Sequence, residues 1–339
     1  MIITMMNNFI FTLFSRPYSW RVVSRLFIFG VALLFIASCN RVKPDGKWTD
    51  TTTAGLVPIA CDQCYEPIIQ EQIDVFEALY IQASIVPIYT DEANAIDLLL
   101  SDSVRLAVAS RQLTEQEKAF LLQSRNMIVR EIKVAQDALA LIVHPTNPDS
   151  MMAMPTLKKI LTGEITEWSE VNPKSKLGKI DVMFDHKNSS TVRFAMDSIC
   201  GNQPLSPGLY AQGSNQKVLD MVAEKPNTLG IIGVNWVSNE NDSTYLSFLS
   251  KVKVMWVSPY AVADLSNSYK PYQAYIALKQ YPLSRNVYFL LTDPKKGLST
   301  GFASFVASDR GQRIILRSGI LPEAPVNIKP VEVKNQGIR

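Results

Sequence analysis

The chain has 339 residues, of which 47% are hydrophobic and 19% are charged, and its formal net charge is only +3. This composition is typical of a globular protein long enough for two domains, and it excludes a largely disordered chain. The small charge is spread along the sequence without a basic stripe, so we expect no nucleic-acid partner.

The N-terminal 38 residues predict an export signal. Arginines precede a short apolar run over 26–38, LFIFGVALLFIAS, which is shorter than the about 20 residues that a membrane span needs. The end of this run and the residue after it, IASC, resemble the lipobox of bacterial lipoproteins, whose cysteine is lipidated and becomes the mature N-terminus. We therefore expect a signal peptide over 1–38 and an exported protein held at the cell envelope by acyl chains on Cys39. An ordinary signal peptide with an incidental cysteine is the alternative.

Residues 39–54, which are polar and contain Pro, Gly and a run of Thr, predict a flexible tether. After the tether, strand patterns alternate with helix patterns. Strands are predicted over 55–60, 83–89, 104–110 and 137–145, and helices over 66–80, 93–100 and 115–124. Thr114 and Glu117 have the spacing of a capping box at the start of the third helix.

The second half of the chain continues this alternation. Residues 157–171 predict a helix that stops at Gly163, and residues 218–236 predict a helix, a turn and a strand. Residues 302–322 predict one helix closed by Gly319 and then a short strand. Alternating strands and helices favour an α/β fold with largely parallel sheets.

The segment DHKNSSTVRF, over 185–194, has Ser189, Ser190 and Thr191 side by side where a helix begins. One interpretation is a helix cap, because a hydroxyl oxygen there accepts an otherwise unpaired backbone N–H. The other is an anion-binding site, in which hydroxyls and N–H groups at the positive end of the helix dipole hold an oxyanion. The segment taken alone favours the cap, since nearly every helix needs one.

Four segments together carry a resemblance to a known family: ILTGEITEW (160–168), NSSTVRF (188–194), NTLGIIG (227–233) and ASDRGQRIILRSGILP (307–322). In this order and spacing they resemble the phosphate-binding proteins of bacterial ABC phosphate importers, and the resemblance covers nearly everything after residue 55. It implies a two-lobed clamshell of the periplasmic-binding-protein type (type 2), each lobe a mostly parallel sheet flanked by helices. It also implies that the ligand is held between the lobes.

The resemblance further implies that the chain crosses between the lobes twice. Residues 55–140 and 271–326 would then build lobe 1, residues 141–270 would build lobe 2, and residues 327–339 would be a C-terminal tail. Residues 137–145 would be the outgoing crossover, and residues 272–293 would be strands that return to lobe 1.

Carried over position by position, the resemblance also implies a set of ligand-binding residues. Ser189, Ser190 and Thr191 fall on the loop that clasps phosphate in lobe 2, which favours the anion-binding interpretation of this segment. In lobe 1, Cys64 and Tyr65 fall on the first ligand loop, Thr90 falls on the second, and Ser110 with Arg111 falls on the third.

The charges depart from the family pattern. Asp185 stands where some relatives have an arginine, and a carboxylate there repels an anion. Arg193, in the first turn of the following helix, or Arg111 in the facing lobe would supply the lost positive charge. A solvated helix residue is the alternative for Arg193. Several acidic residues near the lobe 1 loops oppose anion binding. They are Asp62, Glu66, Asp91 and Glu92.

The function implied by the resemblance is that of a solute-binding lipoprotein. Such a protein would not be an enzyme; it would capture a tetrahedral oxyanion, with phosphate the expected ligand, and deliver it to the permease of an ABC importer. We expect a monomer without a cofactor, and with 2 His and no Cys/His cluster we expect no metal site. A clamshell that acts as a sensor or surface lipoprotein for another small ligand is the alternative, because a fold does not fix a function.

The cysteines and histidines require two classes of enzyme to be considered. The CxxC motif from Cys61 to Cys64 precedes a helix, which is the arrangement of thiol-disulfide oxidoreductases. The architecture that follows is much larger than a thioredoxin fold, which disfavours this reading. Without Cys39, three cysteines remain, including Cys200, and they cannot all pair within one chain. A Ser/His hydrolase is disfavoured because the sequence has no GxSxG motif.

Overall fold

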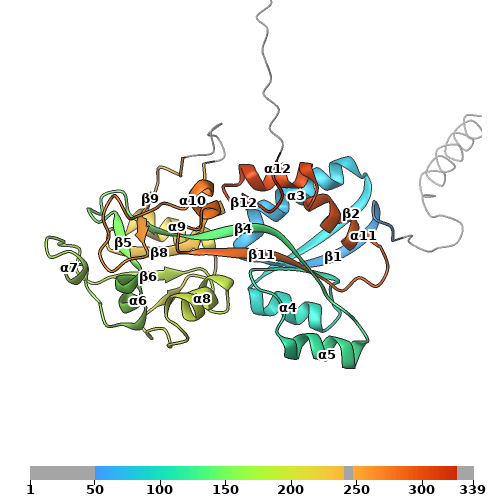
Figure 1. The fold of residues 1–339 in the computed structure, drawn as a ribbon, viewed down its shortest axis with the longest axis horizontal. Helices are drawn as coiled ribbons and strands as arrows, with labels where there is room; N and C mark the ends of the chain where they lie inside the picture. The colour runs from blue at the N-terminus through green and yellow to red at the C-terminus, as the bar shows by residue number, and fades with distance from the viewer. Residues whose placement is uncertain (1–49, 240–246, 327–339) are drawn as a thin grey trace, which may run out of the picture. The chain divides into compact units, whose positions relative to one another are not determined.

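The computed structural model describes residues 50–239 and 247–326, which belong to one compact unit (Figure 1). The predicted signal peptide, the lipidation site Cys39, residues 39–49 of the predicted tether and the C-terminal tail 327–339 lie outside the described residues. Over the described ranges, no helix combines the length and the apolar composition that a membrane span requires.

The main sheet is built from the strands β1 (Ala54–Asp62), β2 (Gln82–Thr90), β3 (Leu106–Ala109), β4 (Arg130–Val143), β6 (Asp181–Phe184), β7 (Tyr210–Ala211), β8 (Thr228–Gly233), β9 (Lys253–Val254), β11 (Ser284–Leu291) and β12 (Leu321–Pro322). A separate pair is formed by β5 (Met151–Ala153) and β10 (Trp256–Ser258). The helices are α3 (Glu66–Leu79), α4 (Glu92–Leu100), α5 (Glu115–Arg125), α6 (Met154–Thr162), α7 (Trp168–Val171), α8 (Ser190–Phe194), α9 (Asn215–Glu224), α10 (Gln273–Ala277), α11 (Leu298–Val306) and α12 (Asp309–Arg317). Short 3₁₀ turns cover η1 (Gln63–Tyr65) and η3 (Val234–Trp236), and a π-helical turn covers η2 (Ala195–Ile199).

Two long strands, β4 and β11, join the halves of the sheet, whose order is β2-β1-β3-β11-β4-β8-β6-β7. They pair antiparallel with each other, while β11 pairs with β3 on one side and β4 with β8 on the other. Beyond them, β1 runs parallel to β2 and β3, and β6 runs parallel to β7 and β8. The expected α/β fold with parallel strands in each half is confirmed, and the two crossing strands make the sheet mixed.

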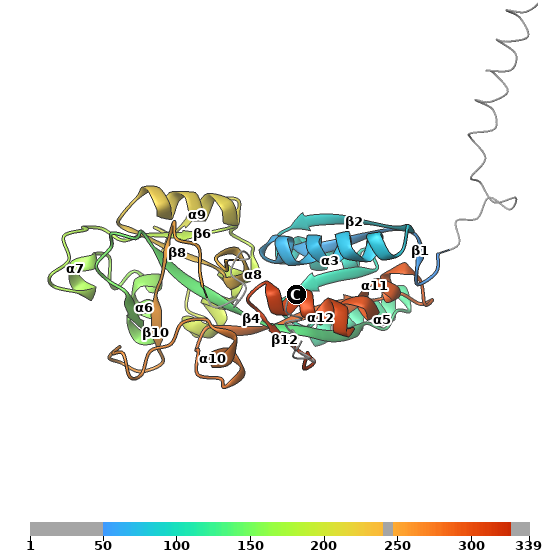
Figure 2. The ribbon, with the colours of Figure 1, turned by 90° about the horizontal axis from the view of Figure 1, so that it is seen from above.

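The halves of this unit form two lobes that lie side by side (Figure 2). We use lobe 1 for β1–β3 with α3–α5, α11 and α12, and lobe 2 for β5–β10 with α6–α9. In lobe 1, α3, α11 and α12 cover one face of the sheet, and α4 and α5 cover the other (Figure 1). One apolar core continues through both lobes, and a smaller one lies beneath α4 and α5. The expected two-lobed architecture is thus confirmed.

Local sequence signals explain where several elements begin and end. At the start of α5, Thr114 and Glu117 form the predicted capping box, in which each side chain accepts the other residue's backbone N–H. At the end of α6, Gly163 has a φ of 84°, in the left-handed region that glycine adopts at little cost. One face of α3 is buried, and its Phe76 packs edge-on against Phe302 of α11.

The segment 272–293 differs from the prediction, since it contains the helix α10 and a single strand, β11. The Gln273 side chain donates to the backbone carbonyls of Leu316 and Ile320 at 2.7 and 2.8 Å. These acceptors lie about α12, far along the chain, so tertiary contacts fix the conformation here. The family resemblance, which implied strands over this whole segment, carries no information about these partners.

The segment 302–322 also differs, because it forms two helices in place of one. The first, α11, begins earlier than predicted, and the chain breaks at Ser308, whose hydroxyl donates to the Phe305 carbonyl at 2.6 Å. Such a side-chain bond competes with the hydrogen bonds that continue a helix. The second helix, α12, ends at Arg317, just before the predicted stop at Gly319.

The first described residues correct the extent of the predicted tether, 39–54. Asp50 Oδ1 accepts the backbone N–H of Leu298 at 2.7 Å, at the start of α11. A carboxylate is favourable there because the N-terminal end of a helix is positive and has unpaired N–H groups. Residues 50–54 are therefore attached to lobe 1, and only residues 39–49 remain as a predicted tether.

Candidate functional site

The predicted hydroxyl segment lies in lobe 2, between β6 and α8. Ser189 is the cap of α8: its Oγ accepts the N–H of Val192 at 3.3 Å and donates to Asp185 Oδ1 at 2.6 Å. Ser190 and Thr191 are also buried, but their side chains reach toward other elements. Ser189 therefore fits the cap interpretation, and the two residues after it are available for a second role.

Arg285, on β11, is the buried cation of the site, with its side chain only 3% exposed. Its Nε donates to Asp137 Oδ2 at 2.8 Å, its Nη1 to Ser190 Oγ at 2.9 Å and its Nη2 to Cys64 Sγ at 2.8 Å. Asp137 lies directly opposite on β4, and the guanidinium lies over the Tyr65 ring, 5.3 Å from its centroid. One side chain thus touches the predicted ligand residues of both lobes.

Cys64 marks where lobe 1 approaches lobe 2. It lies in η1, directly after β1, and its N–H donates to Asp62 Oδ1 at 3.1 Å. Its carbonyl accepts bonds at 2.9 Å from the side chains of Asn235 and Trp236 in lobe 2. A Cβ on Gly233 would stand 2.7 Å from Cys64 Sγ. The last glycine of the NTLGIIG segment therefore permits this close approach.

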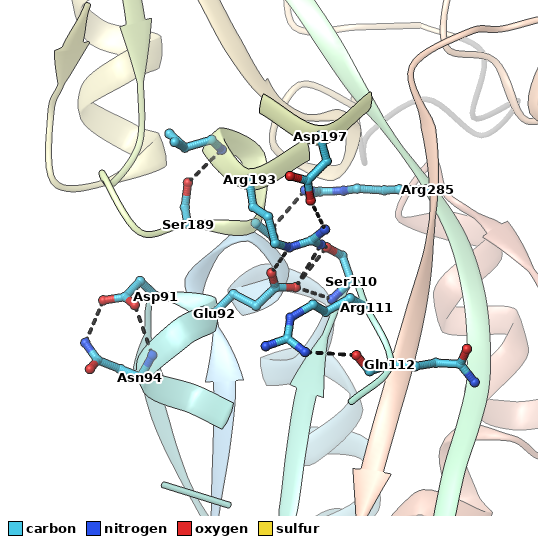
Figure 3. Close-up of polar contacts among 12 residues, drawn as sticks. Asp91, Glu92, Asn94, Ser110, Arg111, Gln112, Ser189, Arg193, Asp197 and Arg285 are labelled. Atoms are coloured by element: carbon cyan, nitrogen blue, oxygen red, sulfur yellow. Dashed lines mark hydrogen bonds and ion pairs between the residues drawn. The ribbon is translucent and has the colours of Figure 1, made fainter. Parts of the chain in front are cut away.

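A second group of polar contacts joins α8 to lobe 1 (Figure 3). Arg193 donates to Glu92 through Nε at 2.5 Å and through Nη2 at 3.4 Å, and Nη2 also donates to Ser110 Oγ at 2.7 Å. Glu92 in turn accepts the N–H and the hydroxyl of Ser110, at 2.7 and 2.9 Å. Burial alone would raise the pKa of the Glu92 carboxyl, but the bonds from Arg193 and Ser110 outweigh it, and the pKa is lowered.

Two predicted site residues, Arg111 and Thr90, take no part in the hydrogen bonds between the lobes described above. The Arg111 guanidinium forms a bidentate pair with Glu117 of α5, at 2.8 Å for both bonds, and also donates to the Gln112 carbonyl. Its guanidinium is therefore paired within lobe 1, and its pKa is raised chiefly by Glu117, with the nearby carboxylates of Glu92 and Asp197 adding to this effect. Thr90 is half-buried at the end of β2.

The site is rich in buried carboxyl groups. They are Asp62, Asp91, Glu92, Asp137 and Asp185. Burial raises the pKa of Asp62 to about 7, assisted by the negative charges of Glu92 and Asp185 and opposed by Arg285 and by a bond with Ser190. Burial also raises the pKa of Asp185 above its ordinary value. In both carboxyls, burial therefore favours the protonated form and lessens the negative charge near the hydroxyls.

Sequence reasoning missed Arg285 and its partner Asp137. The sequence does contain a sign of this pair. Arg285 lies in SRNVYFLL and Asp137 lies in QDALALIV, and each is a charged residue in a segment that otherwise has the pattern of a buried strand. Charged side chains are rarely buried unless they are paired, so a buried arginine in one strand and a buried aspartate in another predict an ion pair. Only the pairing of β4 with β11 shows that the two residues face each other.

The three described cysteines, Cys61, Cys64 and Cys200, are free and buried. Burial raises the pKa of the Cys61 and Cys64 thiols well above the usual value, so both are protonated at neutral pH. A protonated thiol is a poor nucleophile, which disfavours the oxidoreductase reading of the CxxC motif. In the part of the chain that the structure describes, no group of three or more His, Cys, Asp or Glu side chains is arranged to hold a metal ion.

Similar proteins are known by sequence and by structure. The phosphate-binding protein PstS of Borreliella burgdorferi is 24% identical over 273 residues, which cover 78% of this chain and 89% of that protein. PstS of Staphylococcus saprophyticus is 24% identical over 217 residues, 63% of each chain. A putative phosphate ABC transporter substrate-binding protein from Clostridium perfringens, solved with bound phosphate, superposes with a TM-score of 0.67 at 20% identity, covering 80% of this chain and 100% of that one.

An ABC-type phosphate transport receptor from Vibrio cholerae has the same fold, with a TM-score of 0.59 at 21% identity over 79% of this chain and 100% of its own. At these identities the likeness to solved structures concerns the fold. The family model for the PBP superfamily domain matches residues 48–310, which is most of the described chain. This protein therefore belongs to the PBP superfamily.

Proposed function

We propose that this protein is the solute-binding component of an ABC importer and that it captures phosphate between its two lobes. The observation that carries the proposal is Arg285, whose buried guanidinium reaches Ser190 in lobe 2 and Cys64 in lobe 1. A guanidinium presents its N–H groups in a fork that matches an oxyanion. The names of the relatives and the solved structures with phosphate support the same ligand.

The proposed binding residues are those of the two ligand segments, joined by the buried arginine. They are Cys64, Tyr65, Thr90, Ser110, Ser190, Thr191, Arg193 and Arg285, while Ser189 is assigned to the cap of α8. Arg111 is left out because Glu117 occupies it. The hydroxyl of Ser190 and the thiol of Cys64 are neutral partners for Arg285, so a phosphate oxygen between them would make a stronger, charge-assisted bond with the same N–H groups.

The ligand is tested by thermal unfolding of residues 40–339 with phosphate, sulfate, arsenate and molybdate. A ligand that binds only the folded state raises the unfolding temperature in a concentration-dependent way. We expect the largest rise with phosphate or arsenate, which share a protonation state at neutral pH. No rise with any of these anions at millimolar concentration would contradict the proposal.

Variants of two neighbouring hydroxyl residues distinguish ligand binding from helix capping. Thr191→Val keeps the shape and removes a hydroxyl, so phosphate affinity should fall roughly tenfold to a hundredfold, as expected for a charge-assisted hydrogen bond. Ser189→Ala removes both the cap bond to Val192 and the bond to the buried Asp185, so it should cost about 1–3 kcal/mol of unfolding free energy. Calorimetry and urea unfolding on both variants compare the effects. Equal phosphate affinity in Thr191→Val and the unmodified protein would remove Thr191 from the site.

We further propose that the protein is exported, acts as a monomer and docks on a permease while anchored through Cys39. The support is the resemblance of IASC to a lipobox and the family to which the chain belongs. The anchor keeps the clamshell at the membrane, where captured phosphate meets its permease.

A further inference from the structure

The Glu92 carboxylate receives the set of bonds that an anionic ligand of this site would receive. It accepts two bonds from Ser110, through N–H and hydroxyl at 2.7 and 2.9 Å, and two from Arg193, through Nε and Nη2 at 2.5 and 3.4 Å. Figure 3 shows the carboxylate and the guanidinium pointing toward each other across the lobes. Both donors belong to the residues proposed to bind the ligand.

The position of Glu92 is built into lobe 1. It is the first residue of α4, and Asp91 before it caps that helix by accepting the N–H of Asn94 at 3.0 Å. The Glu92 side chain is 3% exposed, and the Arg193 side chain is 30% exposed. A buried carboxylate with two hydrogen-bonded partners is a far stronger interaction than an exposed surface pair.

The ion pair of Glu92 and Arg193 joins the two lobes, whereas two other arginine–carboxylate pairs near the site do not. Asp137 and Arg285 lie opposite each other on adjacent strands, and Arg111 and Glu117 both belong to lobe 1. Glu92 and Arg193, by contrast, come from different lobes. The pair therefore does what a ligand does in a clamshell, since it bridges the two lobes.

We propose that Glu92 is a built-in competitor for the anion, which occupies the donors of Ser110 and Arg193 and closes the lobes while no ligand is present. This inference rests on the proposed function. A phosphate must displace the carboxylate or bind beside it, and like charges at short distance repel each other. Glu92 thereby lowers the affinity of the site and is the residue that sets which oxyanion concentrations fill it.

The test is Glu92→Gln, which keeps the shape and removes the charge. Calorimetry with inorganic phosphate should show affinity at least about tenfold higher than in the unmodified protein, which corresponds to about 1.4 kcal/mol. Glu117→Gln is the control, because it removes the charge of a glutamate that pairs with an arginine inside lobe 1, and it should leave the affinity unchanged. Unchanged or weaker binding by Glu92→Gln would overturn the proposal and make Glu92 a positioning residue for Arg193.

A ligand-free measurement separates this proposal from the proposed function. Small-angle scattering without phosphate should give a larger radius of gyration for Glu92→Gln than for the unmodified protein and Glu117→Gln, because the interlobe bridge is lost. If no variant binds phosphate but Glu92→Gln still opens, the proposed ligand is wrong and the interlobe bridge stands. An unchanged radius of gyration in Glu92→Gln would show that Glu92 does not hold the lobes together.

Discussion

The side chain of Arg285 shows how a charge is retained inside this protein. Its partner Asp137 is 0% exposed, and the two lie opposite each other on the crossing strands. Removing one partner of such a buried pair leaves an uncompensated charge and costs about 3–5 kcal/mol. The pair therefore fixes the guanidinium, and its remaining N–H groups face the neutral Ser190 and Cys64.

Replacing Arg285 by Lys should therefore weaken phosphate binding without removing the charge that balances Asp137. Lysine has its three N–H donors on one nitrogen, so it cannot reproduce the contacts that the separate Nε, Nη1 and Nη2 atoms make with Asp137, Ser190 and Cys64. We expect phosphate affinity, measured by calorimetry, to fall at least about tenfold, equivalent to one lost charge-assisted bond. Arg111→Lys is the control and should bind as the unmodified protein does. If Arg111→Lys shows the loss of affinity and Arg285→Lys does not, the cation that anchors phosphate is Arg111 and not Arg285.

The Asp62 carboxyl predicts a dependence of stability on pH. Its pKa is raised from 3.8 to about 7 in the folded protein, chiefly by burial. Between these values the folded state binds more protons than the unfolded state, so this group's contribution is present at low pH and is lost as the pH rises toward 7. Asp62→Asn, which cannot ionise, should lose less unfolding free energy between pH 4 and pH 8. Parallel stability curves for the two proteins, from urea unfolding, would refute this assignment.

At the scale of elements, the site is made where strands end and helices begin. β1 leads into η1 with Cys64, β6 leads toward α8 with its hydroxyls, and β8 ends at Gly233 beside them. The carboxyl ends of neighbouring parallel strands meet at one edge of a sheet, which is where α/β proteins bind ligands. The close contact of β8 with η1 then holds the two lobes at the distance that the polar bonds require.

This contact makes Gly233 sensitive to a single methyl group. In Gly233→Ala, the added Cβ would lie 2.7 Å from both Cys64 Sγ and Asn235 Oδ1, so these two side chains must move from their present contacts. Overpacking of this kind costs about 1–3 kcal/mol, and we expect it to weaken phosphate binding as well. Gly208→Ala is the control, because its Cβ would meet only Ser206 Oγ, at 3.8 Å. Thermal unfolding measures the stability of the two variants, and calorimetry measures their phosphate affinity. Equal unfolding temperatures and equal affinities would show that η1 and β8 are not tightly packed.

At the scale of the whole molecule, two strands and a small set of polar bridges connect the lobes. β4 and β11 form the covalent crossing, and Arg193 with Glu92, Arg285 with Ser190, and Asn235 with Cys64 bridge the space between lobes. Motions of a clamshell concentrate at such crossings, because few residues there must change conformation. If the proposed site is correct, the same side chains link ligand binding to lobe closure.

The proposed anchor gives a prediction for the complete protein. Cys39→Ser removes the thiol that would be acylated, so the protein should move from the membrane fraction to the soluble fraction after export. Acyl chains contribute about 0.8 kcal/mol for each buried CH₂ group, and two or more chains hold a protein stably. Fractionation of cells that express either form measures the change. Persistence of Cys39→Ser in the membrane fraction would exclude the lipobox interpretation.

The sequence by itself determined the alternation of strands and helices, the capping box at Thr114, the helix stop at Gly163 and the family resemblance. These depend on local signals, such as the spacing of apolar residues and the preference of glycine for positive φ. Only the tertiary structure decided that Arg285 faces Ser190, that Arg111 is held by Glu117 and that Glu92 bridges the lobes. The partners in the first and last of these pairs are far apart along the chain, and their contacts depend on how the strands are ordered. Even the neighbouring pair of Arg111 and Glu117 required the orientation of a side chain, which a sequence pattern does not contain.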